Sequence, residues 1–378
     1  MSYMETYKEW CTNPYFDENT KAELAAIGDD AAEIEDRFYR QLEFGTGGLR
    51  GVIGAGTNRM NIYTVRQATQ GLANYILSQN GQEKGVAIAH DSRIMSTEFA
   101  DEAALCLNAN GIKAYVFDSL RPTPELSFAV RELGCISGIV ITASHNPREY
   151  NGYKVYWEDG AQITPPHDKN ILAEVAKVTS FDQVKTMKKE DAVAAGLYKV
   201  IGKEIDDRYM EELKKQSIHQ EVIKEMAKDI RIVYTPLHGT GNLPVRRVLK
   251  ELGFEQVYVV KEQELPDGNF PCLAARAYAV PDIGGLRVFG RGDPVSERGL
   301  LARGGDIGCP AGGLRDHSRR IELGADICDD MHLPSHENCG IIRKIKNGEV
   351  SPWRLRICIC IPSTACWTAR AASKSCPR

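Results

Sequence analysis

Short apolar runs alternate with amphipathic segments through residues 1–271 of this 378-residue chain. Runs rich in β-branched and small residues predict buried strands at 85–89, 112–117 and 136–142. Between these runs the apolar positions follow helical spacing, and Gly111 or Gly134 ends each segment. Because strands and helices alternate, we expect a parallel sheet covered by helices, which is an α/β architecture.

Helices are also predicted before and between these strands. Residues 1–44 have the pattern of helix with charged faces, and a further helix is expected at about 64–78. Ser96 is a candidate N-cap for the helix after the first strand. Thr123 is expected to cap the next helix, with Pro124 at its first position.

A second α/β unit is predicted from residue 229 onward. Strands at 230–234 and 256–260 flank a helix, which makes one βαβ unit with its first turn at 235–242. The Lys- and Glu-rich stretch before it favours solvated helices, with a linker at about 185–205. We therefore predict one complete domain, one partial domain and an atypical tail, at 1–195, 196–271 and 272–378.

The composition changes abruptly after Pro271. Residues 1–271 contain 18 Lys, 13 Arg, 3 Cys and 23 Tyr plus Phe, whereas residues 272–378 contain 3 Lys, 13 Arg, 8 Cys and 2 Tyr plus Phe. The tail shows little helical or strand periodicity. We interpret it as a frameshifted or disordered segment; a truncated protein carrying a novel domain is the alternative.

Charge and apolar content exclude several classes of protein. The formal net charge is −4 with both signs interspersed, so no basic stripe is available for nucleic-acid phosphates. The sequence contains no run of about 18 apolar residues, so no membrane span is predicted. The N-terminus has no signal-peptide pattern. Cysteines in the first 271 residues are scattered singly, as in reduced proteins. These features predict a cytoplasmic protein with no nucleic-acid or membrane partner, and they leave the oligomeric state open.

The segment most suggestive of chemistry is Thr142–Pro147, which follows the predicted strand 136–142. Ligands of open α/β sheets bind beyond the carboxyl ends of the strands, so Ser144 is expected in a ligand-facing loop. A hydrolase nucleophile fits less well, because the Gly-x-Ser-x-Gly elbow is absent and the adjacent His145 is poorly placed to act as its base. A serine that only caps a turn is the simpler alternative.

Basic side chains are expected near the same edge of the sheet. The glycine-rich segment 45–51 offers backbone N–H groups and Arg50 to a phosphate, although glycine also marks ordinary turns. Arg93 follows the strand at 85–89 and is a candidate for phosphate contact or for shaping the cleft. His238 lies in the first turn of the second unit, where a histidine bonded to the backbone is the simpler interpretation.

These motifs, in this order, resemble those of the phosphoglucomutase and phosphomannomutase superfamily, the α-D-phosphohexomutases. The resemblance covers residues 1–271, and the form of 42–51 is most similar to the phosphoglucomutase and phosphopentomutase branch. It implies mixed α/β/α domains of the phosphohexomutase type. It also implies a mutase that transfers phosphate between the 1- and 6-positions of a sugar through a phosphoserine and a bisphosphate intermediate.

The resemblance further implies roles for particular residues. Catalytic roles are implied for Ser144, His145, Lys154 and Arg50, with Lys154 exchanging a proton with the sugar hydroxyl. Contacts with the sugar phosphate are implied for Thr46, Arg93 and His238. Mg²⁺ is expected as the cofactor, bound in part through the phosphate on Ser144, and glucose 1,6-bisphosphate is expected as the activator.

The chain departs from the family at its metal site. The family's Asp-x-Asp-x-Asp-Arg loop is absent from this sequence, so we expect little mutase activity from this chain. Alternatives are a non-catalytic sugar-phosphate-binding fragment, and phosphomannomutase or phosphopentomutase activity. A weaker alternative is a zinc site in the tail, formed by Cys328, His332, His336 and Cys339.

Overall fold

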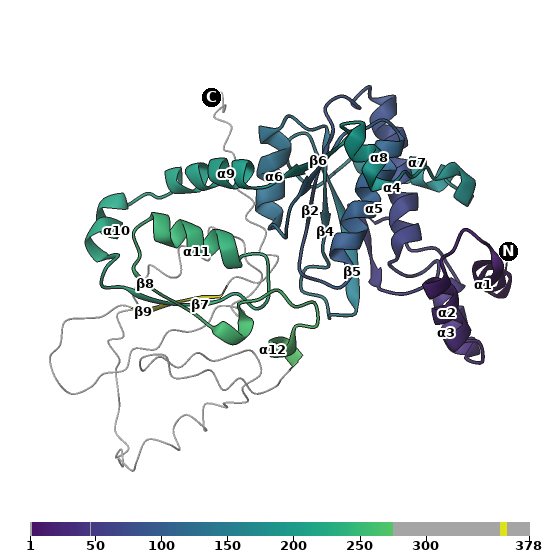
Figure 1. The fold of residues 1–378 in the computed structure, drawn as a ribbon, viewed down its shortest axis with the longest axis horizontal. Helices are drawn as coiled ribbons and strands as arrows, with labels where there is room; N and C mark the ends of the chain where they lie inside the picture. Colours follow the sequence, from purple (N-terminus) through teal and green to yellow (C-terminus); the bar gives the residue numbers. More distant parts are fainter. Residues whose placement is uncertain (1, 46, 275–355, 361–378) are drawn as a thin grey trace, which may run out of the picture.

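A computed structural model describes residues 2–45, 47–274 and 356–360, and it contains two β-sheets with their helices (Figure 1). The first sheet has the strand order β1-β5-β4-β2-β3-β6. Its strands are β1 (Gly48–Val52), β2 (Val86–His90), β3 (Ala114–Phe117), β4 (Ser137–Ile141), β5 (Tyr150–Trp157) and β6 (Tyr198–Ile201). Only β5 runs antiparallel to its neighbours, so the predicted parallel-dominated α/β fold is confirmed.

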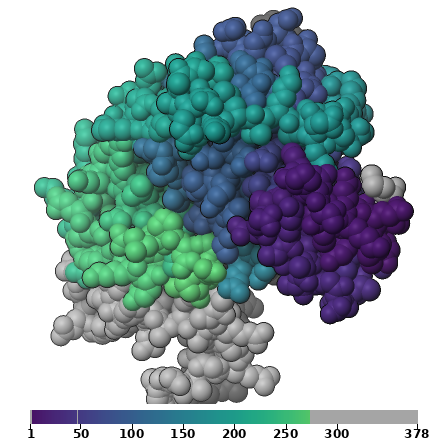
Figure 2. Space-filling model, turned by 45° about the vertical axis from the view of Figure 1, so that its right-hand side comes forward, coloured from purple at the N-terminus to yellow at the C-terminus, as the bar shows by residue number. Residues whose placement is uncertain are grey.

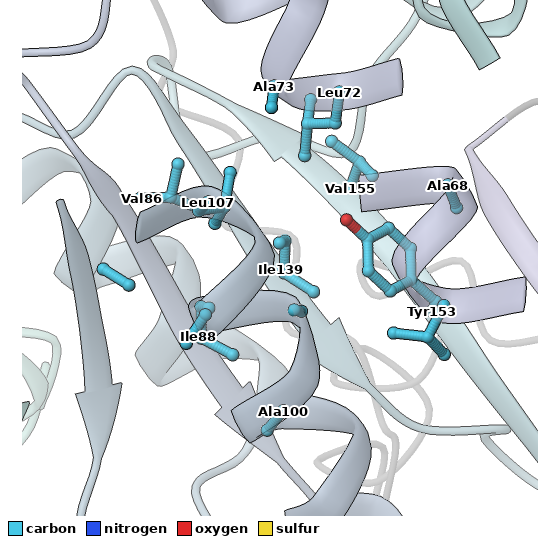
Figure 3. Packing of buried hydrophobic residues seen from close by; sticks show 14 of the residues in the cluster. Ala68, Leu72, Ala73, Val86, Ile88, Ala100, Leu107, Ile139, Tyr153 and Val155 are labelled. Carbon is cyan, nitrogen blue, oxygen red and sulfur yellow. The ribbon is translucent and has the colours of Figure 1, made fainter. Parts of the chain in front are cut away.

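Helices cover both faces of this sheet. One face carries α4 (Ile62–Ser78), α5 (Ser96–Ala109), α7 (His167–Lys177) and α8 (Lys189–Ala194); the other carries α6 (Thr123–Glu132) and α9 (Lys203–Lys215). The larger core lies under α4 and α5, where Leu72 and Leu107 pack toward Ile139 and Val155 (Figure 3). These side chains have no exposed surface, so each stabilises the fold by roughly 1.5–3 kcal/mol.

Three short helices form a separate cluster at the N-terminus: α1 (Tyr3–Thr12), α2 (Glu18–Ala26) and α3 (Ala31–Phe38). Each begins after a residue whose side chain accepts a backbone hydrogen bond from the first turn; these residues are Ser2, Asp17 and Asp30. Trp10 and Phe16 stack with ring centroids 4.2 Å apart in the core of this cluster. The helical prediction for 1–44 is thus confirmed as three helices.

The second unit is built on β7 (Arg231–Thr235), with the parallel strands β8 (Gln256–Val259) and β9 (Arg356–Cys360) on either side. Its helices are α10 (Gln220–Met226), α11 (Asn242–Glu251) and α12 (Pro271–Ala274). Figure 2 shows this unit, in green, packed beside the blue and teal residues of the first domain. Strand β9 comes from the tail, where the composition indicated no strand.

Several strands differ from the sequence-based predictions. Strand β1 occupies part of the segment expected to be a glycine-rich loop. Strand β6 lies in the expected linker, just past the predicted boundary at 195, and it pairs with β3 in the first sheet. Both proposed caps were also wrong. Met95 precedes α5, and Ser96 donates its hydroxyl hydrogen bond to Asp91 instead. Pro122 precedes α6, so Thr123 is the first residue of that helix and Pro124 the second.

Within the described ranges, no helix is both long enough and apolar enough to cross a membrane. The candidate zinc ligands at 328–339 lie outside the residues that the structure describes.

Candidate active site

The Ser144 loop begins where β4 ends, at the carboxyl edge of the first sheet. Ser144 has a left-handed backbone, with φ of +59°, which is uncommon for a residue with a side chain. Its N–H donates to Thr142 Oγ1 at 3.1 Å, and the Thr142 hydroxyl donates to Asp91 Oδ2 at 2.6 Å. The unusual backbone is therefore held by a buried polar network, and Ser144 is left half-buried at the edge of the sheet.

His145 lies beside the Ser144 hydroxyl. The Ser144 Oγ and His145 Nδ1 atoms are 3.3 Å apart, and His145 is exposed. The expectation that neighbours in sequence are poorly placed for this contact was wrong, because the left-handed turn at Ser144 brings the two side chains together. The pair can exchange a proton at Ser144 Oγ.

Arg93 is buried beneath the same loop and holds it by its backbone. Its Nη1 donates to the carbonyl oxygens of Pro147 (2.8 Å) and Tyr150 (2.9 Å). Its Nη2 donates to those of Ser144 (3.0 Å) and Asn146 (2.7 Å). This geometry differs from the predicted phosphate contact, because both terminal nitrogens are already engaged by loop carbonyls. The structure thus shows Arg93 holding the loop, and its contact with a phosphate stays a prediction.

Asp91 is the counter-charge of Arg93. Its Oδ2 lies 3.4 Å from Arg93 Nε, and both side chains are almost fully buried. Asp91 Oδ1 also accepts hydrogen bonds from the Arg93 N–H and the Ser96 hydroxyl, so both carboxylate oxygens are satisfied. Burial lowers the pKa of Arg93; Asp91 opposes this shift, and nearby Arg50 adds to it. Arginine side chains keep their proton in proteins, so the Arg93 guanidinium is a cation.

Arg50 and Lys154 lie on one face of the sheet. Arg50 is opposite Gly152, and Gly48 is opposite Lys154, in the antiparallel β1–β5 pair. Since opposite residues share a face and so do residues two apart, both cations are on the same side of the sheet. Arg50 is exposed, and its Nη1 donates to the Asn146 side chain in the Ser144 loop at 3.2 Å. The structure thus places the Arg50 guanidinium beside the loop that carries Ser144.

Of the other two predicted site residues, the structure describes one. Thr46 lies outside the described residues. His238 is buried in the second unit, where its ring Nδ1 lies 2.8 Å from the Leu265 carbonyl oxygen. The structure connects His238 to its own unit and not directly to Ser144.

Some residues of the site were not singled out from the sequence. Asn151 has no exposed surface, and its Nδ2 donates to the Ile94 carbonyl (3.0 Å) and the Ser96 hydroxyl (2.9 Å). Asp91 directly follows β2, and Asn151 lies near the start of β5. The available signal was that each polar residue adjoins a buried strand, where it needs partners.

Among the residues that the structure describes, the oxygen ligands near Ser144 do not fit an Mg²⁺ site. Both oxygens of Asp91 are engaged, and the exposed Glu149 pairs with Arg148 at 3.3 Å. Across the described ranges, no group of three His, Cys, Asp or Glu side chains is arranged to hold a metal ion. Mg²⁺ sites in proteins combine one or two carboxylates with phosphate oxygens and water, so a phosphate on Ser144 alone would lack the carboxylates.

Comparison with known proteins places this arrangement in a family. Residues 41–182 match the profile described as phosphoglucomutase/phosphomannomutase, alpha/beta/alpha domain I, and residues 207–278 match domain II. The chain belongs to the phosphoglucomutase/phosphomannomutase family. The resemblance expected from the sequence is confirmed, and the second match extends past residue 271.

Family members of several names are similar to this chain. A probable phosphoribomutase of Schizosaccharomyces pombe is 35% identical over 324 residues, covering 78% of this chain and 54% of the relative. A Staphylococcus saprophyticus phosphoglucomutase is 38% identical over 237 residues, covering 63% and 42%. The structure of a putative phosphomannomutase from Thermus thermophilus is similar with a TM-score of 0.51 and 26% identity, over 61% and 48%. The chain thus spans about half the length of the curated relatives it matches.

Proposed function

We propose that this chain binds a phosphorylated sugar at the Ser144 edge and that Ser144 accepts a phosphoryl group there. The observation that supports this most directly is the Ser144 loop itself, fixed by the buried Arg93 and faced by the exposed Arg50. A phosphoserine carries about −1.5 to −2 charges at neutral pH, so nearby cations stabilise it. The names of the relatives favour a sugar phosphate as the ligand.

The proposed reaction moves one phosphoryl group from Ser144 to a hydroxyl of the sugar. The bond between Oγ and phosphorus breaks as a bond forms between phosphorus and a sugar hydroxyl oxygen. The hydroxyl proton passes to a base, for which we propose Lys154, and His145 supplies a proton to Ser144 Oγ. The reverse step at the other end of the sugar bisphosphate restores the phosphoserine. Glucose 1,6-bisphosphate is the proposed activator because it can load Ser144 from either end.

We further propose that this chain turns over slowly or not at all. The family's magnesium loop is missing from the sequence, and the carboxylates at the site are engaged elsewhere. Cationic side chains alone provide less stabilisation for a transferred phosphoryl group than they do together with a metal ion. Binding and a single phosphorylation of Ser144 are therefore expected to survive better than catalysis.

The test is incubation with glucose 1,6-bisphosphate, followed by mapping of phosphate by mass spectrometry. We expect phosphate on Ser144 and its loss in Ser144→Ala, whereas Ser180→Ala, at an exposed serine, keeps the label. Label on another residue with Ser144 bare would contradict the proposal. A parallel assay of glucose 1-phosphate conversion separates a mutase from a non-catalytic binding fragment, and assays with ribose and mannose phosphates report the preferred sugar.

A further inference from the structure

Phe270 of the second unit covers the buried arginine of the first. Its ring centroid lies 5.2 Å from Arg93 Cζ, and Phe270 itself is 6% exposed. A guanidinium over an aromatic face is stabilised by the ring quadrupole, most strongly where water is excluded. Arg93 is therefore held from two sides, by Asp91 within its own domain and by an aromatic ring from the other unit.

The segment that carries Phe270 fits closely against the loop that carries Arg93. A Cβ atom on Gly268 would lie 2.6 Å from the Ile94 backbone nitrogen and 3.0 Å from the Ser92 carbonyl oxygen. Only glycine permits this approach without displacement of one backbone. The contact thus involves the main chain of both units as well as the Phe270 ring.

His238 fixes the beginning of the same segment. The backbone N–H of His238 donates to the Gln263 carbonyl at 2.9 Å, and its ring Nδ1 lies 2.8 Å from the Leu265 carbonyl oxygen. Leu237 and His238 both have left-handed backbones, with φ of +51° and +60°. Two such residues in succession are costly and persist where the surroundings stabilise them. The turn after β7 is thereby shaped to hold residues 263–270.

We propose that His238 and Phe270 are positioning residues for the Ser144 loop, and that docking of the second unit on Arg93 fixes the phosphoryl acceptor. His238 holds the segment, Phe270 covers Arg93, and Arg93 binds the backbone of the loop by four hydrogen bonds. The role given to the loop rests on the proposed function. The link between the two units does not depend on any sugar.

Hydrogen exchange of the full chain tests the link. Phe270→Leu keeps an apolar side chain but removes the aromatic face, and we expect amide exchange across residues 142–150 to accelerate about tenfold. The matched control is Phe254→Leu, since Phe254 packs in the second unit's own core. The control is expected to leave exchange across 142–150 unchanged. Equal exchange in Phe270→Leu and the unaltered protein would overturn the proposal.

A second readout separates positioning from general stability. We expect Phe270→Leu to lower the rate of Ser144 phosphorylation by glucose 1,6-bisphosphate about tenfold while the Kd for glucose 1-phosphate changes little, and Phe270→Tyr to restore the rate. If the unaltered protein takes no phosphate, the proposed function fails and the exchange result still decides the link. Should Phe270→Leu not fold, Gly268→Ala pushes the same segment from Ile94 and is subject to the same two outcomes.

Discussion

The Thr142 hydroxyl donates a 2.6 Å hydrogen bond to Asp91 Oδ2, which joins the carboxyl ends of β4 and β2. That same oxygen is the counter-charge of Arg93, so one carboxylate both anchors the Ser144 loop and neutralises the cation beneath it. Removing one partner of a buried ion pair leaves the other charge uncompensated in a poorly solvated site. The Asp91–Arg93 pair should therefore be more sensitive to substitution than the exposed ion pairs.

The first prediction concerns Asp91→Asn, which keeps the size of the side chain and removes its charge. We expect the free energy of unfolding to fall by about 3 kcal/mol, measured by urea denaturation. The control is Glu18→Gln, which removes the exposed partner of Lys21 and should cost less than about 1 kcal/mol. Similar losses of unfolding free energy in the two variants would show that Asp91 does not stabilise the buried charge of Arg93.

The second prediction concerns Gly152, which lies between β1 and β4. A Cβ atom there would be 2.7 Å from the Thr142 carbonyl oxygen and 3.0 Å from that of Leu49. Gly152→Ala should destabilise the protein by about 1–3 kcal/mol, since both neighbours are backbone atoms in the sheet. Gly45→Ala is the control, because its Cβ would approach no atom closer than 3.8 Å. The measurement is thermal unfolding of both variants. Equal shifts in Tm would show that close packing is not the reason for glycine at position 152.

The parts of the fold that sequence patterns predicted are those with one clear period. Strands β2, β3 and β4 are short apolar runs, and each was placed within a few residues. Strand β5 was missed because both of its faces are largely covered, which removes the alternation that marks a half-buried strand. Strand β6 was missed because its lysine and its exposed positions resemble the polar helices around it.

The site was predicted in part for a related reason. Strand ends indicated Ser144 and Arg93, since parallel strands present their carboxyl ends at one edge. The burial of Arg93 and its stacking on Phe270 depend on how two distant segments dock, and local sequence carries no signal for that contact. A charged residue at a strand end looks the same in sequence whether it faces a ligand or supports a loop.

The third prediction concerns Arg50, whose guanidinium is exposed and contacts Asn146 in the Ser144 loop. Arg50→Ala should slow phosphorylation of Ser144 by glucose 1,6-bisphosphate about a hundredfold, because it removes a fixed donor from the transferring phosphoryl group. The measurement is a time course of Ser144 labelling by mass spectrometry. Arg40→Ala removes an exposed arginine that pairs with Glu43, and it should label at the unaltered rate. An Arg50→Ala protein that labels as fast as this control would remove Arg50 from the site.

The fourth prediction is that the free energy of unfolding depends on pH through a buried carboxyl group where α6 meets α9. Burial raises the pKa of Glu125 to about 9, and the neighbouring Asp206 carboxylate adds to the shift. Burial opposes ionisation of Asp206 as well, but bonds from Arg121 at 2.7 and 2.9 Å keep the pKa of Asp206 below its ordinary value. Glu125 is therefore protonated in the folded protein at neutral pH.

The sign of the effect follows from proton uptake. Between the ordinary pKa of 4.5 and the folded value of about 9, unfolded Glu125 is ionised while folded Glu125 holds its proton. The unfolded state then binds fewer protons, so the free energy of unfolding decreases as the pH rises through this window. Glu125→Gln removes the titration and keeps the shape. Urea denaturation measures the effect. Between about pH 6 and about pH 8, the free energy of unfolding should fall by at least about 1 kcal/mol more in the unaltered protein than in this variant. The exposed Glu190→Gln is the control and should follow the unaltered protein; if Glu125→Gln does so too, Glu125 is ionised in the fold.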